Sequence, residues 1–189
     1  MSVAAITDPT LVALLDYWQM KRGNRTMPER RDIDPLEMGS YLLPHLVLCD
    51  LFDRGTRVRF RLVGTVVVKR LGADPTGKYL DAAVSGAYLE VAAALHRLVY
   101  CQRAPIYSES LFTWGTGRRL EARHLLLPLT QGGPEPAIAL GGFAFHAAEP
   151  FPPTLRALAA KGAHEELRRL TPNLPVPREW VAAGGRNVA

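Results

Sequence analysis

The sequence predicts an α+β fold in which a five-stranded antiparallel sheet carries its helices on one face, with an amphipathic helix before it and a helical tail after it. Two observations support this prediction. Helix-like and strand-like segments follow in the order helix, helix, strand, strand, short helices, long helix and three strands. The turns between successive strands are short and rich in Gly or Pro, which is typical of hairpins, so neighbouring strands pair antiparallel.

Two helix-start signals precede the predicted sheet. An Asp-Pro pair at residues 8–9 supplies an N-cap and a favourable first helical residue, and Gly23 ends the helix. The apolar stripe of this helix is Leu11, Leu14, Leu15 and Trp18. A second Asp-Pro pair at residues 34–35 predicts a short helix, which Pro44 prevents from continuing beyond Leu43.

The first two strands are predicted over residues 45–52 and 57–64, with a hairpin turn at Arg54 and Gly55. The first is apolar on both faces. The second alternates strictly, so one of its faces lies on a core and the other is wet or at an interface. The residues on the face that is wet or at an interface are Arg57, Arg59 and Arg61.

A crossover then leaves the sheet edge over residues 65–84 through small helices and glycine turns, and we expect a cavity between these helices and the sheet. Ser85 is the expected N-cap of the longest internal helix, which runs to about Gln102. Its apolar stripe is Val91, Ala94, Leu95 and Leu98. The last three strands are predicted over residues 105–114, 119–130 and 137–146.

The tail after the sheet is predicted to hold amphipathic helical stretches. Their apolar residues are Leu155 and Leu158, and then Leu167 and Leu170. The chain is thus expected to divide into an N-terminal helix with its connecting loop (1–34), a sheet domain (35–150) and a helical or loose tail (151–189).

Composition argues against several classes of protein. The net charge is +5, but the arginines are scattered among acidic residues, whereas a nucleic-acid footprint would be clustered and of one sign. No apolar run reaches the length of a membrane span, and the N-terminus lacks the pattern of a signal peptide, so we expect a cytoplasmic protein that binds neither nucleic acid nor membrane. Cys49 and Cys101 are too few for a disulfide framework or a zinc site.

No catalytic motif is present. The chain has no G-x-S-x-G sequence, and the glycines at residues 115–117 lack the G-K-[ST] ending of a phosphate loop. The five histidines are isolated from one another, which argues against a metal site. They are His45, His96, His124, His146 and His164.

Four stretches in this order resemble a PAS domain, and more specifically a bacterial family of single-domain PAS-like proteins. They are residues 14–38 with "RDIDP", residues 42–52 with "LLPHL", residues 60–81 with "RLVGT" and a later "TG", and residues 125–129, "LLLPL". The resemblance covers most of residues 10–146. It implies a non-enzymatic sensory or adaptor module that binds a small ligand, a signalling partner protein, or both. The alternatives are a small-molecule enzyme on a cone-like α+β scaffold and a haem-binding PAS sensor.

A ligand cavity is expected between the long helix and the sheet. The residues expected to line it are Phe60, Leu62, Val91, Leu95, Leu98, Ala122, His124 and Leu126. The alternation of its strand points His124 inward, as a core histidine or as a polar anchor for a ligand. His96 lies on the helix where haem-binding PAS domains place their axial histidine, but it is one step off the apolar stripe, which predicts a surface or rim position. We expect no metal, haem or flavin, because the asparagine-cysteine-arginine motif of flavin-binding PAS domains is also missing.

Self-association is the remaining expectation. A homodimer would form through Leu11, Leu14, Leu15 and Trp18. The arginines of the second strand make the outer face of the sheet unfavourable for packing this apolar stripe, whereas the same stripe of a second copy is favourable. In the alternative, outer residues of the last three strands, such as Leu127 or Phe143, cover the stripe within one chain.

Overall fold

The computed structural model describes residues 6–113, 119–147 and 155–158, and a single antiparallel sheet organises them. Its six strands lie in the order β2-β1-β5-β4-β3-β6. Their bounds are β1 Leu46–Phe52, β2 Arg57–Val63, β3 Ile106–Thr113, β4 Arg119–Thr130, β5 Pro136–Ala147 and β6 Leu155–Leu158. Every pair of neighbouring strands is antiparallel, as predicted.

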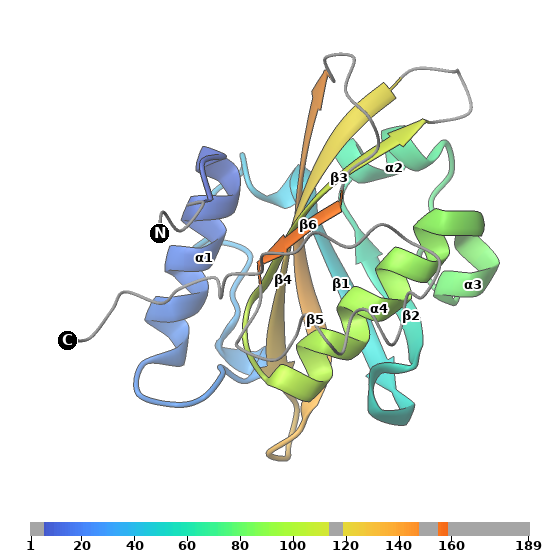
Figure 1. Ribbon diagram of the computed structural model, residues 1–189. Coiled ribbons are helices and arrows are strands. Elements are labelled where there is room, and N and C mark those ends of the chain that lie inside the picture. Colours follow the sequence, from blue (N-terminus) through green and yellow to red (C-terminus); the bar gives the residue numbers. More distant parts are fainter. Residues whose placement is uncertain (1–5, 114–118, 148–154, 159–189) are drawn as a thin grey trace.

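Helices cover both faces of the sheet. The four α-helices are α1 Pro9–Arg22, α2 Thr65–Leu71, α3 Leu80–Ala83 and α4 Gly86–Gln102. Three single-turn 3₁₀ helices are η1 Arg30–Asp32, η2 Leu43–His45 and η3 Asp53–Gly55. Figure 1 shows α4 on one face of the sheet with α2 and α3 beside it, and α1 on the opposite face. The described helices include none that is long and apolar enough to cross a membrane.

The five predicted strands, the first helix and the long helix are confirmed, and two predicted helices are wrong. After Asp34 the chain makes turns instead of a helix. The Glu37 N–H donates to the Asp34 carbonyl and the Met38 N–H to the Pro35 carbonyl, which are three-residue turns, and Gly39 then has a φ of +74°, through which a helix does not continue. Residues 155–158 form β6, which pairs with β3 and protects an otherwise open edge. Leu167 and Leu170 lie outside the described residues.

The helix α1 is docked on the sheet of its own chain, which corrects the interface predicted for a homodimer. Leu11, Leu14 and Trp18 are almost fully buried, and Leu15 packs beside them in the same cluster. The Trp18 indole N–H donates to the Pro128 carbonyl of β4 at 3.0 Å. The stripe is therefore covered within one chain, and it is not open to a second copy.

A glycine on β5 allows this close docking. A Cβ atom at Gly142 would lie 2.5 Å from Leu14 Cδ2 and 3.0 Å from Leu11 Cδ2, so a side chain there would force these two buried leucine side chains to move. Leu127 belongs to the cluster under α1, as the one-chain alternative expected. Phe143 instead packs on the α4 side of the sheet.

The sheet separates two apolar cores. The strand β1 is buried on both faces and contributes Val47, Cys49 and Leu51 to the α4 side. On the α1 side, it contributes Leu46 and Leu48. This explains why its sequence is apolar without alternation.

A β-bulge in β2 displaces one predicted cavity residue. Cys49 pairs with Phe60, but Leu48 pairs with Leu62, so Arg61 is an extra residue in β2. The extra residue reverses the alternation beyond it. Leu62 therefore points away from α4, with 48% of its surface exposed.

We expect Leu14→Ala to lower the free energy of unfolding by about 2–5 kcal/mol, because it empties a fully buried site between α1 and the sheet. Val12→Ala, on the exposed side of the same helix, should change it by less than about 0.5 kcal/mol. Urea unfolding of both variants measures the difference. Equal effects, or a Leu14→Ala effect that depends on protein concentration, would contradict docking within one chain.

Candidate functional site

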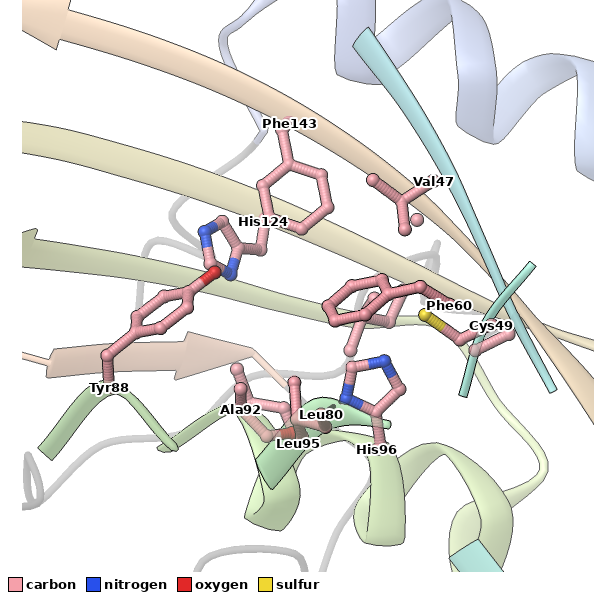
Figure 2. Close-up of a pocket in the computed structure, with 13 residues that line it drawn as sticks. Val47, Cys49, Phe60, Leu80, Tyr88, Ala92, Leu95, His96, His124 and Phe143 are labelled. Atoms are coloured by element: carbon pink, nitrogen blue, oxygen red, sulfur yellow. Dashed lines mark hydrogen bonds between the residues drawn. The ribbon is translucent and has the colours of Figure 1, made fainter. Parts of the chain in front are cut away.

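A small cavity lies between α4 and the sheet, and it is the candidate functional site (Figure 2). The space open to the centre of a water molecule in it is about 20 Å³, which is room for roughly one water. Apolar and aromatic side chains form most of the wall. The lining residues are Val47, Cys49, Phe60, Leu80, Tyr88, Ala92, Leu95, His96, His124, Leu126, Ala139, Gly141 and Phe143.

The helix α4 brings His96 into this wall, which corrects its predicted surface position. Tyr88, Ala92 and His96 are spaced four residues apart and so share one face of the helix. This face is the one that lies on the cavity, and only 6% of the surface of His96 is exposed. The buried face of α4 is wider than the stripe around Leu95 and Leu98, because the η3 turn also packs against the helix.

The η3 turn can approach α4 because its last residue is glycine. Gly55 has a φ of +79°, and a Cβ atom there would lie 2.8 Å from Tyr100 Cβ and 3.2 Å from the His96 carbonyl oxygen. The β1–β2 hairpin thus closes over the turn of α4 that carries His96.

The hydrogen bonding of His96 fixes what its ring can do in the cavity. Its Nδ1 lies 2.7 Å from the Ala92 carbonyl oxygen, and since a carbonyl only accepts, Nδ1 carries the proton. Burial lowers the pKa of His96, although the bond to Ala92 opposes this shift, so the ring is neutral near pH 7. Nε2 is then an unprotonated acceptor, and it is buried with no hydrogen-bond partner in the described part of the chain.

His124 on β4 is the second imidazole of the wall. Burial, helped by the proximity of His96, lowers the pKa of His124 to about 3, so it is also neutral. Its Nε2 is buried and has no hydrogen-bond partner among residues 6–113, 119–147 and 155–158. The ring lies 4.3 Å from that of Phe143 and meets the ring of Tyr88 edge-on at 6.3 Å. In Figure 2 the hydroxyl end of Tyr88 is directed toward His124.

The remaining wall supplies little polarity. Burial raises the pKa of the Cys49 thiol, which therefore stays protonated. No Asp or Glu is present among the described residues that line the cavity. The described residues also contain no group of three or more metal-ligating side chains.

Four of the eight residues expected to line the cavity do so, namely Phe60, Leu95, His124 and Leu126. Val91, Leu98 and Ala122 are buried but lie outside the cavity wall, and Leu62 is turned away by the bulge. Among the residues that sequence reasoning missed are Tyr88, Ala92 and His96. Their four-residue spacing was visible in the sequence, but the more apolar stripe beside it dominated the pattern.

Comparison with known proteins agrees with this architecture. A family model described as a PAS domain matches residues 6–144, a range that includes α1 and all the lining residues. The chain belongs to this PAS domain family, whose membership indicates a sensory or signalling module. Neither the search of curated proteins nor the search of solved structures found a match to the chain.

The two buried imidazoles should make the protein less stable in mild acid. Below a pH of about 6.5 the unfolded chain protonates both rings while the folded protein keeps His124 neutral. Stability is therefore complete above that pH and falls as the pH moves from 6.5 toward 3. His124→Leu should reduce the loss between pH 7.5 and 5.5 by about 1.4 kcal/mol, as measured by urea unfolding at both values.

Leu95→Ala is the matched control, because it removes an apolar group from the same wall. It should lower stability at both pH values and leave the difference between them unchanged. A His124→Leu protein with the wild-type pH dependence would show that His124 is not a neutral buried group.

Proposed function

We propose that this chain is a non-enzymatic sensor module whose cavity between α4 and the sheet binds a small, largely apolar molecule that carries a hydrogen-bond donor. The supporting observation is the buried Nε2 atom of His96, an acceptor without a partner in the described structure, in an otherwise apolar wall. A buried polar atom without a hydrogen bond costs about 1–3 kcal/mol. A ligand that donates to it recovers this free energy, which favours binding at this site.

The size of the cavity bears on how a ligand enters. About 20 Å³ holds one water, so any larger ligand needs side chains to move apart. The part of the wall that moves most easily is the part made by short elements. Leu80 belongs to α3, which is a single turn. Tyr88 is close to the start of α4 and is only partly buried. We infer that a ligand opens the cavity between α3 and the first turn of α4.

A porphyrin or an isoalloxazine ring does not fit this wall as it stands, even though His96 offers an Nε2 atom of the correct tautomer for an iron. Such a ring needs a volume of several hundred Å³, so the cavity of about 20 Å³ would have to open much further for it than for a single aromatic ring. We therefore favour a small organic ligand over a haem or flavin.

An enzyme is a weaker interpretation. General acid–base catalysis near pH 7 needs a group whose pKa lies close to that pH. The pKa of His124 is lowered to about 3, and the described wall has no carboxylate to activate either imidazole. Binding without chemistry is consistent with these properties.

We expect indole and phenol, each an apolar ring with one donor, to raise the melting temperature of the wild-type protein more than benzene does. At a ligand concentration 100 times the Kd, the gain is about 2.7 kcal/mol, which raises the melting temperature of a chain of this size by about 5–11 °C. Thermal unfolding followed by circular dichroism measures the shift. His96→Leu should abolish the advantage of indole and phenol over benzene.

Cys101→Ser is the matched control, since Cys101 lies on the same helix but is exposed. It should keep the wild-type response to all three probes. If His96→Leu also keeps it, or if none of the probes stabilises the wild type and native mass spectrometry finds no retained small molecule, the proposal fails.

The purified protein should have no visible absorption band of haem or flavin. An absorption spectrum from 350 to 700 nm, recorded after incubation with excess hemin or flavin mononucleotide and gel filtration, provides the measurement. A retained band that is lost in His96→Ala, or in Cys101→Ala, would favour the cofactor sensor instead.

A further inference from the structure

The outer face of the sheet carries a basic groove at its β2 edge, on the side of α1. Its volume is about 540 Å³, and its polar lining includes Arg59, Arg61, Thr76 and Gln131. Asp50 is the one acidic side chain among the described residues that line it. The helix α1 packs over β4 and β5 and leaves the β2 edge uncovered. Figure 1 shows β2 at the edge of the sheet that is distant from α1.

The arginine row, Arg57, Arg59 and Arg61, follows the length of β2 beside this groove. All three residues are exposed, although apolar neighbours are buried between them. Arg57 and Arg59 are separated by two strand positions, about 6 to 7 Å. Side chains at alternate positions of an extended peptide have the same separation.

The guanidinium groups of the arginine row are held in place before any partner binds. Arg59 donates to Asp50 Oδ2 through Nε at 3.2 Å and through Nη2 at 2.8 Å, and Arg61 Nη1 lies 3.2 Å from Asp50 Oδ1. Arg59 also lies over the ring of Phe52. Two positive groups share one buried carboxylate, which leaves a net positive charge and unused N–H donors at the surface.

Arg57 is positioned by an aromatic ring. Its guanidinium carbon lies 4.0 Å from the centre of the Tyr79 ring. A guanidinium stacked in this way keeps its edge donors available for a carboxylate. Phe52 and Leu62 expose apolar surface beside the row, 39% and 48% respectively.

The free edge of β2 is partly closed, which determines the mode of binding. The Phe60 N–H donates to the Lys78 carbonyl at 2.9 Å, and the Gly77 N–H donates to the Phe60 carbonyl at 2.7 Å. An added strand cannot pair there without displacing these bonds. A partner must instead lie on the face and contact the arginine side chains.

We propose that the arginine row and its groove bind an extended acidic peptide segment of a partner protein, with carboxylates at alternate positions and apolar residues between or beside them. Arginine binds carboxylates through paired hydrogen bonds, which gives the row its geometric preference. The groove combines one acidic side chain, exposed apolar surface and a short row of arginines. This combination favours a peptide over a nucleic acid, which requires a broad surface of positive charge. This proposal does not depend on the cavity binding a ligand.

Fluorescence anisotropy with a labelled peptide tests the proposal. The probe alternates Glu and Val over eight residues, and a second peptide of the same composition gathers the four Glu residues in one block. The alternating peptide should bind the full-length protein more tightly, and added salt should weaken binding. The double variant Arg57→Gln with Arg61→Gln, which keeps the Arg59–Asp50 pair, should lose about tenfold in affinity.

Lys69→Gln on α2 is the control, because Lys69 is exposed and its removal changes the net charge without touching β2. It should bind the alternating peptide as the wild type does. Melting temperatures confirm that the variants are folded. Equal affinity for the two peptides, equal losses in Lys69→Gln and the double variant, or tighter binding of a single-stranded oligonucleotide would each overturn the proposal.

Discussion

The burial of two neutral imidazoles in an apolar interior is the constraint on which the rest of this structure depends. The helix α4 can lie against the sheet only if His96 enters the core, because the four-residue repeat that places Tyr88 and Ala92 on the cavity also places His96 there. One nitrogen of His96 is satisfied by the helix backbone. The other faces the cavity, so the fold retains an acceptor that a compact apolar core would have excluded.

The two faces of the sheet differ in how tightly they are packed, and the proposed ligand site lies on the less tightly packed face. The α1 face is sealed by Leu11, Leu14 and Trp18, and the close approach over Gly142 leaves no space there. The α4 face keeps the cavity, and α3, which lines the cavity through Leu80, is a single turn of helix. Short elements contribute few buried contacts and open at a lower free energy than long ones, so we expect the side of the sheet that holds the proposed ligand site to open more readily than the α1 side. The arginine row lies on the α1 face of the sheet, but at the β2 edge, which α1 does not cover.

Much of the architecture could be predicted from the sequence, because it is encoded locally. The Asp8 N-cap, the glycine stops and the alternation of β2 identify α1 and the strands without knowledge of the fold. The position of Leu62 could not be predicted, since the bulge at Arg61 depends on pairing with β1 and changes no local pattern. β6 was missed for a similar reason: four residues of strand are defined by their partner β3. His96 was misplaced because its neighbours Leu95 and Arg97 suggested a boundary of the apolar stripe, whereas the η3 turn extends the buried face.

The most direct test of the central claim is the protonation of the His96 ring in solution. Long-range ¹H–¹⁵N correlation spectra of the histidine side chains report the tautomer of each ring. The structure requires His96 to be neutral at pH 7, with the proton on Nδ1, and binding of a ligand with a donor should shift the resonance of the unprotonated Nε2. A ring protonated on Nε2, or a charged ring, would contradict the account, because the cavity would then contain no acceptor for a ligand.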